Sequence, residues 1–164
     1  MTTPLPGTIG LVATRTFAGL LIRLGTRSKI DHAYIVMSDG VTVFEARPSG
    51  AGHAAMSKYP GATFRDDIPL TNEQRFKILA STEPLLGTPY SWLDIAALTV
   101  YVFIGRRLPR FVQRRIENTK TLICSQLCDL VYADAGVHLF DDGRSPGEVT
   151  PQDLVACMPV KEEN

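Results

Sequence analysis

Three residues of this sequence have the chemistry needed to attack a carbonyl carbon: Cys124, His32 and Glu45. Cys124 stands at the expected start of a helix, where unpaired N–H groups and a partial positive charge favour thiolate over thiol. The same N–H groups can stabilise the oxyanion that forms when a thiolate attacks a carbonyl. A Cys–His pair oriented by a third polar group is the general arrangement for nucleophilic acyl transfer.

The positions of His32 and Glu45 depend on an expected hairpin. Two β-rich runs, residues 32–37 and 41–46, flank Asp39-Gly40. An Asp-Gly pair between such runs predicts a two-residue type I′ turn. That turn pairs Val36 with Val43.

The same register predicts which side chains of the hairpin meet. Tyr34 pairs with Glu45, and because side chains alternate along a strand, one face carries His32, Tyr34, Glu45 and Arg47. His32 and Glu45 then become diagonal neighbours, which long side chains can bridge. A carboxylate there would hold the imidazole in one tautomer and stabilise its cation. A one-residue bulge would move Glu45 to the opposite face.

Structural interpretations of these residues compete with the catalytic one. Free cysteine is among the most buried residue types, so Cys124 also fits a core position, and Cys128, one turn further on, is expected in the core. His32 also fits a half-buried strand position, and we expect His53 and His138 at the surface. A zinc site built from Cys124, Cys128 and His32 is another option, but the cysteine spacing lacks the second ligand pair typical of structural zinc.

Composition and periodicity indicate one α+β domain over residues 1–164. The hydrophobic share of 45% is that of a globular protein, and zero net charge argues against a nucleic-acid binder. Three clustered cysteines suit a reducing compartment, and the N-terminus lacks the pattern of a signal peptide, so we expect a cytoplasmic or phage-associated protein. The expected elements are a strand at 7–13, a helix from Thr16 to Gly25, the hairpin, a loop at 48–61, a strand at 63–70, a helix at 71–86 capped by Thr71 and Gln74, and a helix at 123–135 before Gly136.

A nearly continuous apolar segment, residues 92–104, precedes a basic one with Arg106, Arg107, Arg110, Arg114 and Arg115. The segment is too short to span a bilayer, which needs about 20 residues. A core helix followed by a solvated basic helix is the simplest interpretation. Alternatively, the segment is a lid that docks on anionic lipid, or the arginines line a groove for an anionic cell-wall peptide.

Six segments resemble the permuted papain-like cysteine hydrolases of the NlpC-type superfamily, the branch with YiiX-like proteins and lecithin:retinol acyltransferase-like enzymes. They are Gly7-Thr-Ile-Gly-Leu-Val, Ile30-Asp-His-Ala-Tyr-Ile-Val, Val43-Phe-Glu-Ala-Arg-Pro-Ser-Gly, Leu86-Gly-Thr-Pro-Tyr-Ser-Trp92, Cys124-Ser-Gln-Leu-Cys-Asp-Leu-Val and Thr150-Pro-Gln-Asp-Leu154. The His hairpin precedes the Cys helix, as in the permuted branch. This sequence departs from the family pattern at Asp31, where serine is usual, and at Gln126, where glutamate is usual.

The resemblance implies a circularly permuted papain-like α+β fold, with a small antiparallel sheet packed against helices. It implies Cys124 as nucleophile, His32 as base and Glu45 as the orienting residue. The candidates near the substrate or oxyanion are Tyr90, Tyr34 and Ser125. The function implied first is a thiol-dependent hydrolase, without metal or cofactor, that cleaves an amide bond in a cell-wall (peptidoglycan) peptide. The alternatives are a lipid acyl hydrolase or acyltransferase at a membrane surface, and a catalytically inactive binding module.

Overall fold

An antiparallel sheet forms the centre of the chain in a computed structural model, which describes residues 3–16, 19–20, 23, 28–90, 122–140, 142–143 and 149–157. Within these residues the sheet has five strands in the order β4-β3-β2-β1-β5. The strands are β1 Ile9–Val12, β2 His32–Val36, β3 Thr42–Glu45, β4 Gly52–Ala55 and β5 Thr63–Phe64. Sheet and helices together confirm the expected α+β class.

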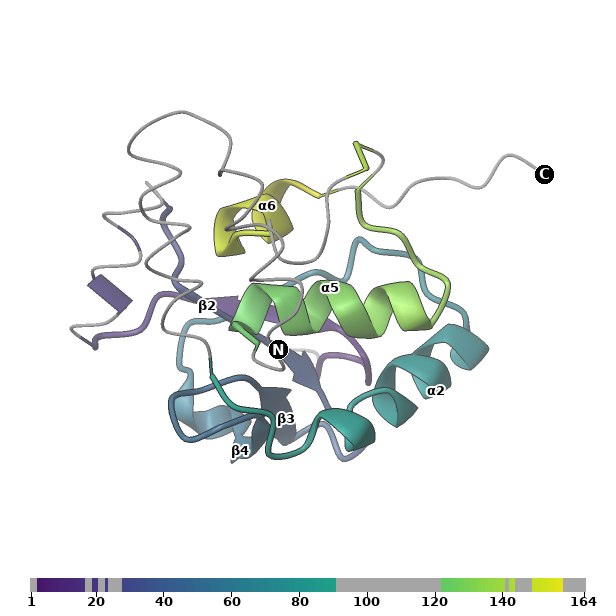
Figure 1. The fold of residues 1–164 in the computed structure, drawn as a ribbon, viewed down its shortest axis with the longest axis horizontal. Helices are drawn as coiled ribbons and strands as arrows, with labels where there is room; N and C mark the ends of the chain where they lie inside the picture. The colour runs from purple at the N-terminus through teal and green to yellow at the C-terminus, as the bar shows by residue number, and fades with distance from the viewer. Residues whose placement is uncertain are drawn as a thin grey trace.

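Three helices accompany the sheet in the described part of the chain: α2 Asn72–Ala80, α5 Cys124–Asp134 and α6 Pro151–Ala156. α5 lies across β2, with α2 and α6 packed on either side of it (Figure 1). The hydrophobic core lies between this helical layer and the sheet, where alternate strand residues such as Ile35 and Phe44 meet Leu127 and Cys128 of α5. The predicted core position of Cys128 is therefore confirmed.

The opposite face of the sheet carries a second, smaller cluster around Tyr34, with Val12, Val36, Val43 and Ala54. Gly10 lies directly opposite Tyr34 in the β1–β2 pair. A Cβ at Gly10 would stand 2.1 Å from a carbon of the Tyr34 ring. Only glycine therefore lets the ring lie flat on β1, and the ring in turn supports the face on which His32 stands.

The hairpin has the predicted register but a different turn. Val36 pairs with Val43, as expected. The closing bond, however, runs from Met37 N–H to the Thr42 carbonyl at 2.9 Å, so the loop has four residues, 38–41, rather than two. The Asp39 carboxylate causes this difference, because it accepts hydrogen bonds from the N–H groups of Val41 and Thr42 and satisfies them within the wider loop.

Two other element predictions are wrong in extent. The expected loop at 48–61 contains β4 and a 3₁₀ turn, η1 (Met56–Lys58). Its small residues give no strand pattern, yet edge pairing with β3 needs only their backbone groups. The strand expected at 63–70 is confined to β5.

The helix expected at 71–86 ends early. α2 stops at Ala80, and a second 3₁₀ turn, η2 (Glu83–Leu85), follows. Pro84 explains the break, since it lacks an N–H group and its ring would clash with the preceding turn of a helix. The capping box of Thr71 and Gln74 is confirmed.

The last long helix is confirmed, and Gly136 follows it with a φ of 75°. The helix expected from Thr16 falls largely outside the described residues, although the Thr16 hydroxyl accepts a hydrogen bond from Gly19 N–H, as an N-cap does. Residues 92–104 and the arginines that follow also lie outside the described residues.

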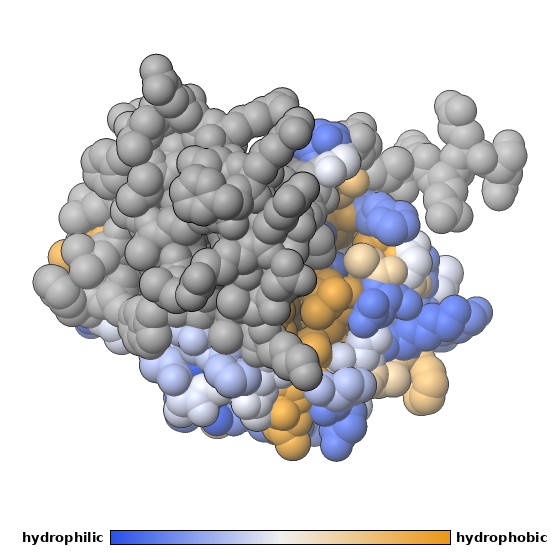
Figure 2. Space-filling view, viewed as in Figure 1, coloured by the Kyte–Doolittle hydropathy of each residue, from blue (hydrophilic) through white to orange (hydrophobic). Residues whose placement is uncertain are grey.

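On the face shown in Figure 2, the described surface is mainly hydrophilic and is interrupted by a narrow hydrophobic strip. Among the described residues, no helix combines the length and hydrophobicity that crossing a bilayer requires.

Candidate active site

Cys124 is the first residue of α5, and two features fix this helix start. The side chain of Gln126 accepts a hydrogen bond from Ile123 N–H at 3.0 Å, which caps the helix. The preceding Leu122 forms a parallel bridge with Tyr90. Cys124 is only 2% exposed, and its Sγ lies 3.9 Å from the Asp31 carbonyl oxygen.

His32 opens β2 and contacts both of the other candidate residues. Its Nε2 lies 2.5 Å from Glu45 Oε2 across the hairpin, so the predicted neighbourhood of the two side chains is confirmed. The Cys124 side chain lies close enough to the imidazole to raise the pKa of His32. The structure therefore brings Cys124, His32 and Glu45 together in one chain of contacts, from the start of α5 to β3.

This environment stabilises the charged form of His32. Burial by itself lowers the pKa of His32, but the hydrogen bonds with Cys124 and Glu45 and the charges of both partners outweigh it. Together they raise the pKa from 6.5 to about 10. The imidazole is thus a cation at neutral pH, ready to donate a proton.

Glu45 is held as a carboxylate although it is 1% exposed. Burial raises its pKa, but the hydrogen bonds from His32 and Tyr59 outweigh burial, and the net pKa is lowered. The Tyr59 hydroxyl donates to the same Glu45 oxygen that His32 contacts. Arg47 Nη1 stands 3.8 Å from the other oxygen. Burial and the hydrogen bond to Glu45 raise the pKa of Tyr59, so the phenol keeps its proton and stays a donor.

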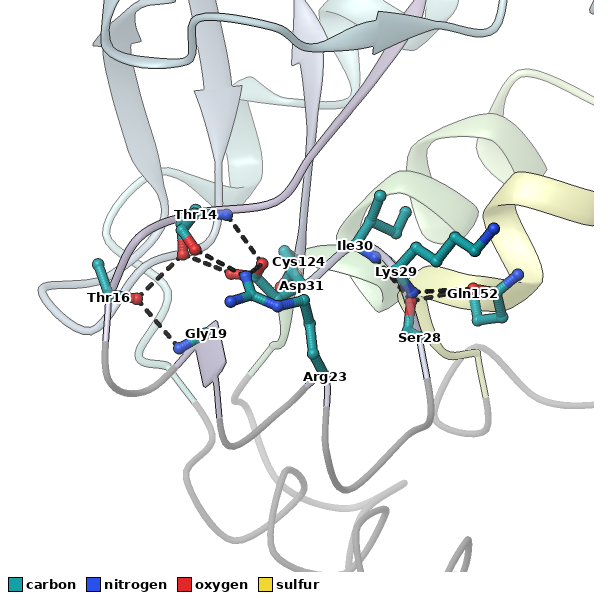
Figure 3. Close-up of polar contacts among 10 residues, drawn as sticks. All are labelled: Thr14, Thr16, Gly19, Arg23, Ser28, Lys29, Ile30, Asp31, Cys124 and Gln152. Atoms are coloured by element: carbon teal, nitrogen blue, oxygen red, sulfur yellow. Dashed lines mark hydrogen bonds and ion pairs between the residues drawn. The ribbon is translucent and has the colours of Figure 1, made fainter.

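Asp31 anchors the backbone beside the thiol (Figure 3). Its buried carboxylate accepts hydrogen bonds from the Thr14 N–H and hydroxyl groups and pairs with Arg23 at 2.5 Å. These bonds fix the residue whose carbonyl oxygen faces Cys124. Asp31 therefore adds a paired, buried carboxylate next to the site.

A cavity of about 900 Å³ opens beside this arrangement. Its described walls include His32, Glu45, Tyr59 and Tyr90. Cys124 is not among them. The imidazole therefore faces the cavity directly, whereas the sulfur of Cys124 is covered.

The structure places the other predicted site residues as follows. Burial raises the pKa of the Tyr90 phenol, and the proximity of Cys124 and Asp31 raises it further. Tyr34 is buried beside His32 with a ring-centroid separation of 6.4 Å. Ser125 is buried, and its hydroxyl donates to the Val149 carbonyl at 2.6 Å. This hydrogen bond gives the side chain a structural role. His53 is exposed, as predicted.

Sequence reasoning missed the roles of Tyr59 and of the Asp31 carboxylate. Tyr59 belongs to a segment expected to be a loop, and no periodic pattern links it to His32. Its ring centroid nevertheless lies 5.3 Å from that of His32 and 5.2 Å from that of Tyr34. The one sequence feature that pointed to either residue was the position of Asp31 directly before His32.

Sheet, helices and site define an α+β protein in which a helix-start cysteine, a strand histidine and a buried glutamate meet beside a cavity. The fold is YiiX-like: the crystal structure of metalloprotein YiiX from Escherichia coli O157:H7 matches with a TM-score of 0.66 at 18% sequence identity, over 99% of each chain. No family model matches the sequence. No curated protein matches it either.

The description of YiiX as a metalloprotein raises the question of a metal site in this chain. Within the described residues, no three His, Cys, Asp or Glu side chains gather as metal ligands would. Cys128, the second cysteine of the zinc option, is fully buried in the core, and burial raises the pKa of its thiol, which disfavours the thiolate that zinc needs. The described residues therefore do not fit that site.

Proposed function

We propose that this protein is a thiol-dependent acyl hydrolase with a circularly permuted papain-like fold, in which Cys124, His32 and Glu45 act together. The observation that supports the proposal is the position of the His32 imidazole, which hydrogen-bonds with the Glu45 carboxylate and lies close enough to Cys124 for that side chain to raise its pKa. This is the order of contacts that nucleophile, base and orienting group need.

The proposed reaction has two steps. The Cys124 thiolate attacks the carbonyl carbon and forms a C–S bond, while N–H groups at the start of α5 receive the developing oxyanion. The His32 imidazolium donates a proton to the departing amine or alcohol as its bond to carbon breaks. Neutral His32 then takes a proton from water, whose oxygen attacks the thioester carbonyl. The C–S bond breaks, which releases the acid and restores the Cys124 thiolate and the His32 imidazolium.

Glu45 and Tyr59 support this cycle without touching the substrate carbonyl. Glu45 would keep one imidazole tautomer and stabilise the cation during the first step. Tyr59 would hold the carboxylate by donating to it. Neither residue supplies the nucleophile, so we assign both as positioning residues.

The proposed substrate is an amide bond in a cell-wall peptide, which rests on analogy with the wider superfamily. The lipid alternative depended on residues 92–104 and the arginines after them, so no described contact favours it. Purified muropeptides and anionic liposomes would separate the two, with cleavage products measured by mass spectrometry.

The decisive experiment is trapping of the acyl-enzyme with p-nitrophenyl acetate. We expect a burst of p-nitrophenol and an acetyl group on Cys124, measured by rapid mixing and peptide mass spectrometry. Cys124→Ala and His32→Ala should lose the burst while keeping the circular dichroism spectrum. The matched control is Cys157→Ala, which removes a different buried thiol. Acetylation spread equally over the cysteines, or an undiminished burst in His32→Ala, would contradict the proposal.

A further inference from the structure

Besides His32, three cationic side chains line the cavity beside the candidate site: Arg15, Arg47 and Lys58. Arg15 and Lys58 are exposed, and neither makes an ion pair with any other described residue. They come from the segment after β1 and from η1, so the tertiary structure alone brings them to one cavity.

The carboxylates in the described walls do not balance these charges. Asp31 is already paired with Arg23, and the single charge of Glu45 is shared between His32 and Arg47, so Arg15 and Lys58 have no carboxylate opposite them in these described walls. The cavity therefore presents a net positive field to any group that enters it.

Arg47 adds a half-buried guanidinium to the wall of the cavity. Its guanidinium lies over Gly52, where a Cβ would stand 3.3 Å from Nη2. Its Nε is buried and has no hydrogen-bond partner among the described residues. A buried donor without a partner is costly, and an entering anionic oxygen would satisfy it.

We propose that this cavity binds the negatively charged group of the acyl substrate, a carboxylate or a phosphate, through Arg15, Arg47 and Lys58. The inference rests on the proposed function, because it takes the cavity beside His32 as the place where substrate binds. It narrows the substrate class to amides or esters that carry an anionic group near the scissile carbonyl.

Alkylation of Cys124 with iodoacetate and iodoacetamide tests the inference. The two reagents share one reaction, in which the sulfur displaces iodide, but only iodoacetate carries a negative charge. We expect the ratio of the second-order rate constants, iodoacetate over iodoacetamide, to fall about threefold in Arg15→Gln and again in Arg15→Gln/Lys58→Gln. This is the factor expected for one charge at about 6 Å in an effective dielectric near that of water. Lys77→Gln, which removes a positive charge on α2 outside the cavity, should leave the ratio unchanged.

A second measurement needs no reactive thiol. Glutarate and inorganic phosphate should raise the melting temperature of the full chain more than neutral glutaramide does at equal ionic strength, because a ligand that binds only the folded state stabilises it. The increase should shrink in Arg15→Gln/Lys58→Gln. A larger effect of glutarate than of phosphate would identify a carboxylate as the group bound, and the reverse a phosphate.

Failure of the inference differs from failure of the proposed function. An unchanged ratio of the two alkylation rate constants in the double variant, with no selective stabilisation by either anion, would overturn the proposal that the cavity binds anions. If Cys124 were still alkylated rapidly in that case, the hydrolase proposal would remain. Resistance of Cys124 to both reagents would contradict the hydrolase proposal, and the melting measurements would still decide whether the cavity binds anions.

Discussion

At the residue scale, the site depends on two buried charges that stabilise each other. His32 lies among buried side chains that would by themselves favour its neutral form, and Glu45 lies among side chains that would favour the protonated acid. Their direct contact reverses both tendencies. Removing either partner therefore leaves the other as a buried charge without the opposite charge that stabilises it.

The charge of His32 gives a prediction about pH. Because its pKa in the native state is raised to about 10, its contribution to stability is complete below about 6.5, the value in the unfolded chain, and is lost as pH rises through about 10. We expect the imidazole ¹³C signal of His32 in NMR spectra to shift near pH 10. Cys124→Ala should lower that midpoint, since the thiol partner raises the pKa. A midpoint near 6.5 in both proteins would contradict the proposed Cys–His contact.

Tyr59→Phe tests the positioning role of the phenol. The change removes one donor to Glu45 and keeps the ring, so the pKa of Glu45 should rise and the acid limb of the pH–rate profile should move to higher pH. We expect p-nitrophenyl acetate turnover to fall about tenfold, the factor that corresponds to about 1.4 kcal/mol. Tyr132→Phe is the matched control, because its hydroxyl donates to the Gly7 carbonyl in the core. It should lower stability without moving the pH profile, and an unmoved profile in Tyr59→Phe would rule out the role.

At the element scale, the start of α5 and the edge strand β4 position the site. β4 and the turn after it return the chain so that Tyr59 faces His32. The N-cap of α5 sets the direction of the helix that carries Cys124. β4 is held by backbone hydrogen bonds to β3, whereas α5 is held by the side chains that it buries in the core.

Gln126→Ala tests the helix start. The variant loses the hydrogen bond from Ile123 N–H, which we expect to cost about 1 kcal/mol and to loosen the first turn under Cys124. Urea unfolding gives the stability and alkylation by iodoacetamide gives the effect on the thiol. Thr71→Ala removes the comparable cap of α2, away from the site. It should cost a similar free energy and leave the alkylation rate unchanged, and equal rate effects in both variants would show that Gln126 acts only through global stability.

At the scale of the whole molecule, the end of the described chain is fastened to the sheet. The Arg65 guanidinium, after β5, donates to the carbonyl oxygens of Leu154 and Cys157 and pairs with Asp67 at 2.8 Å. Arg65 is 8% exposed. These contacts join the end of α6 to the segment that follows β5.

Arg65→Met should therefore destabilise the whole protein, by about 3 kcal/mol, because it leaves buried carbonyl groups without donors. The free energy of unfolding in urea measures this, and the transition should stay cooperative. Lys77→Met, which breaks an exposed pair with Glu73, should leave the unfolding midpoint nearly unchanged. An equally small effect of Arg65→Met would show that α6 does not contribute to stability.

The sequence determined the local geometry on which the site depends. Strand periodicity placed His32 and Glu45 on one face. The predicted pairing of the two strands holds although the turn differs, because Asp39 lengthens the loop by one residue on each side and leaves the same residues paired. Helix signals placed Cys124 at a helix start. These features were predictable because backbone geometry repeats at short range, so that spacing alone decides which side chains share a face.

Only the tertiary structure decided which distant segments meet. The contact of Cys124 with His32, the hydrogen bond from Tyr59 to Glu45 and the gathering of Arg15 and Lys58 at one cavity each join segments with no shared periodicity. Such contacts depend on how a helix packs across a sheet and where an edge strand pairs. Those choices are set by the burial of the whole core, which local spacing does not encode.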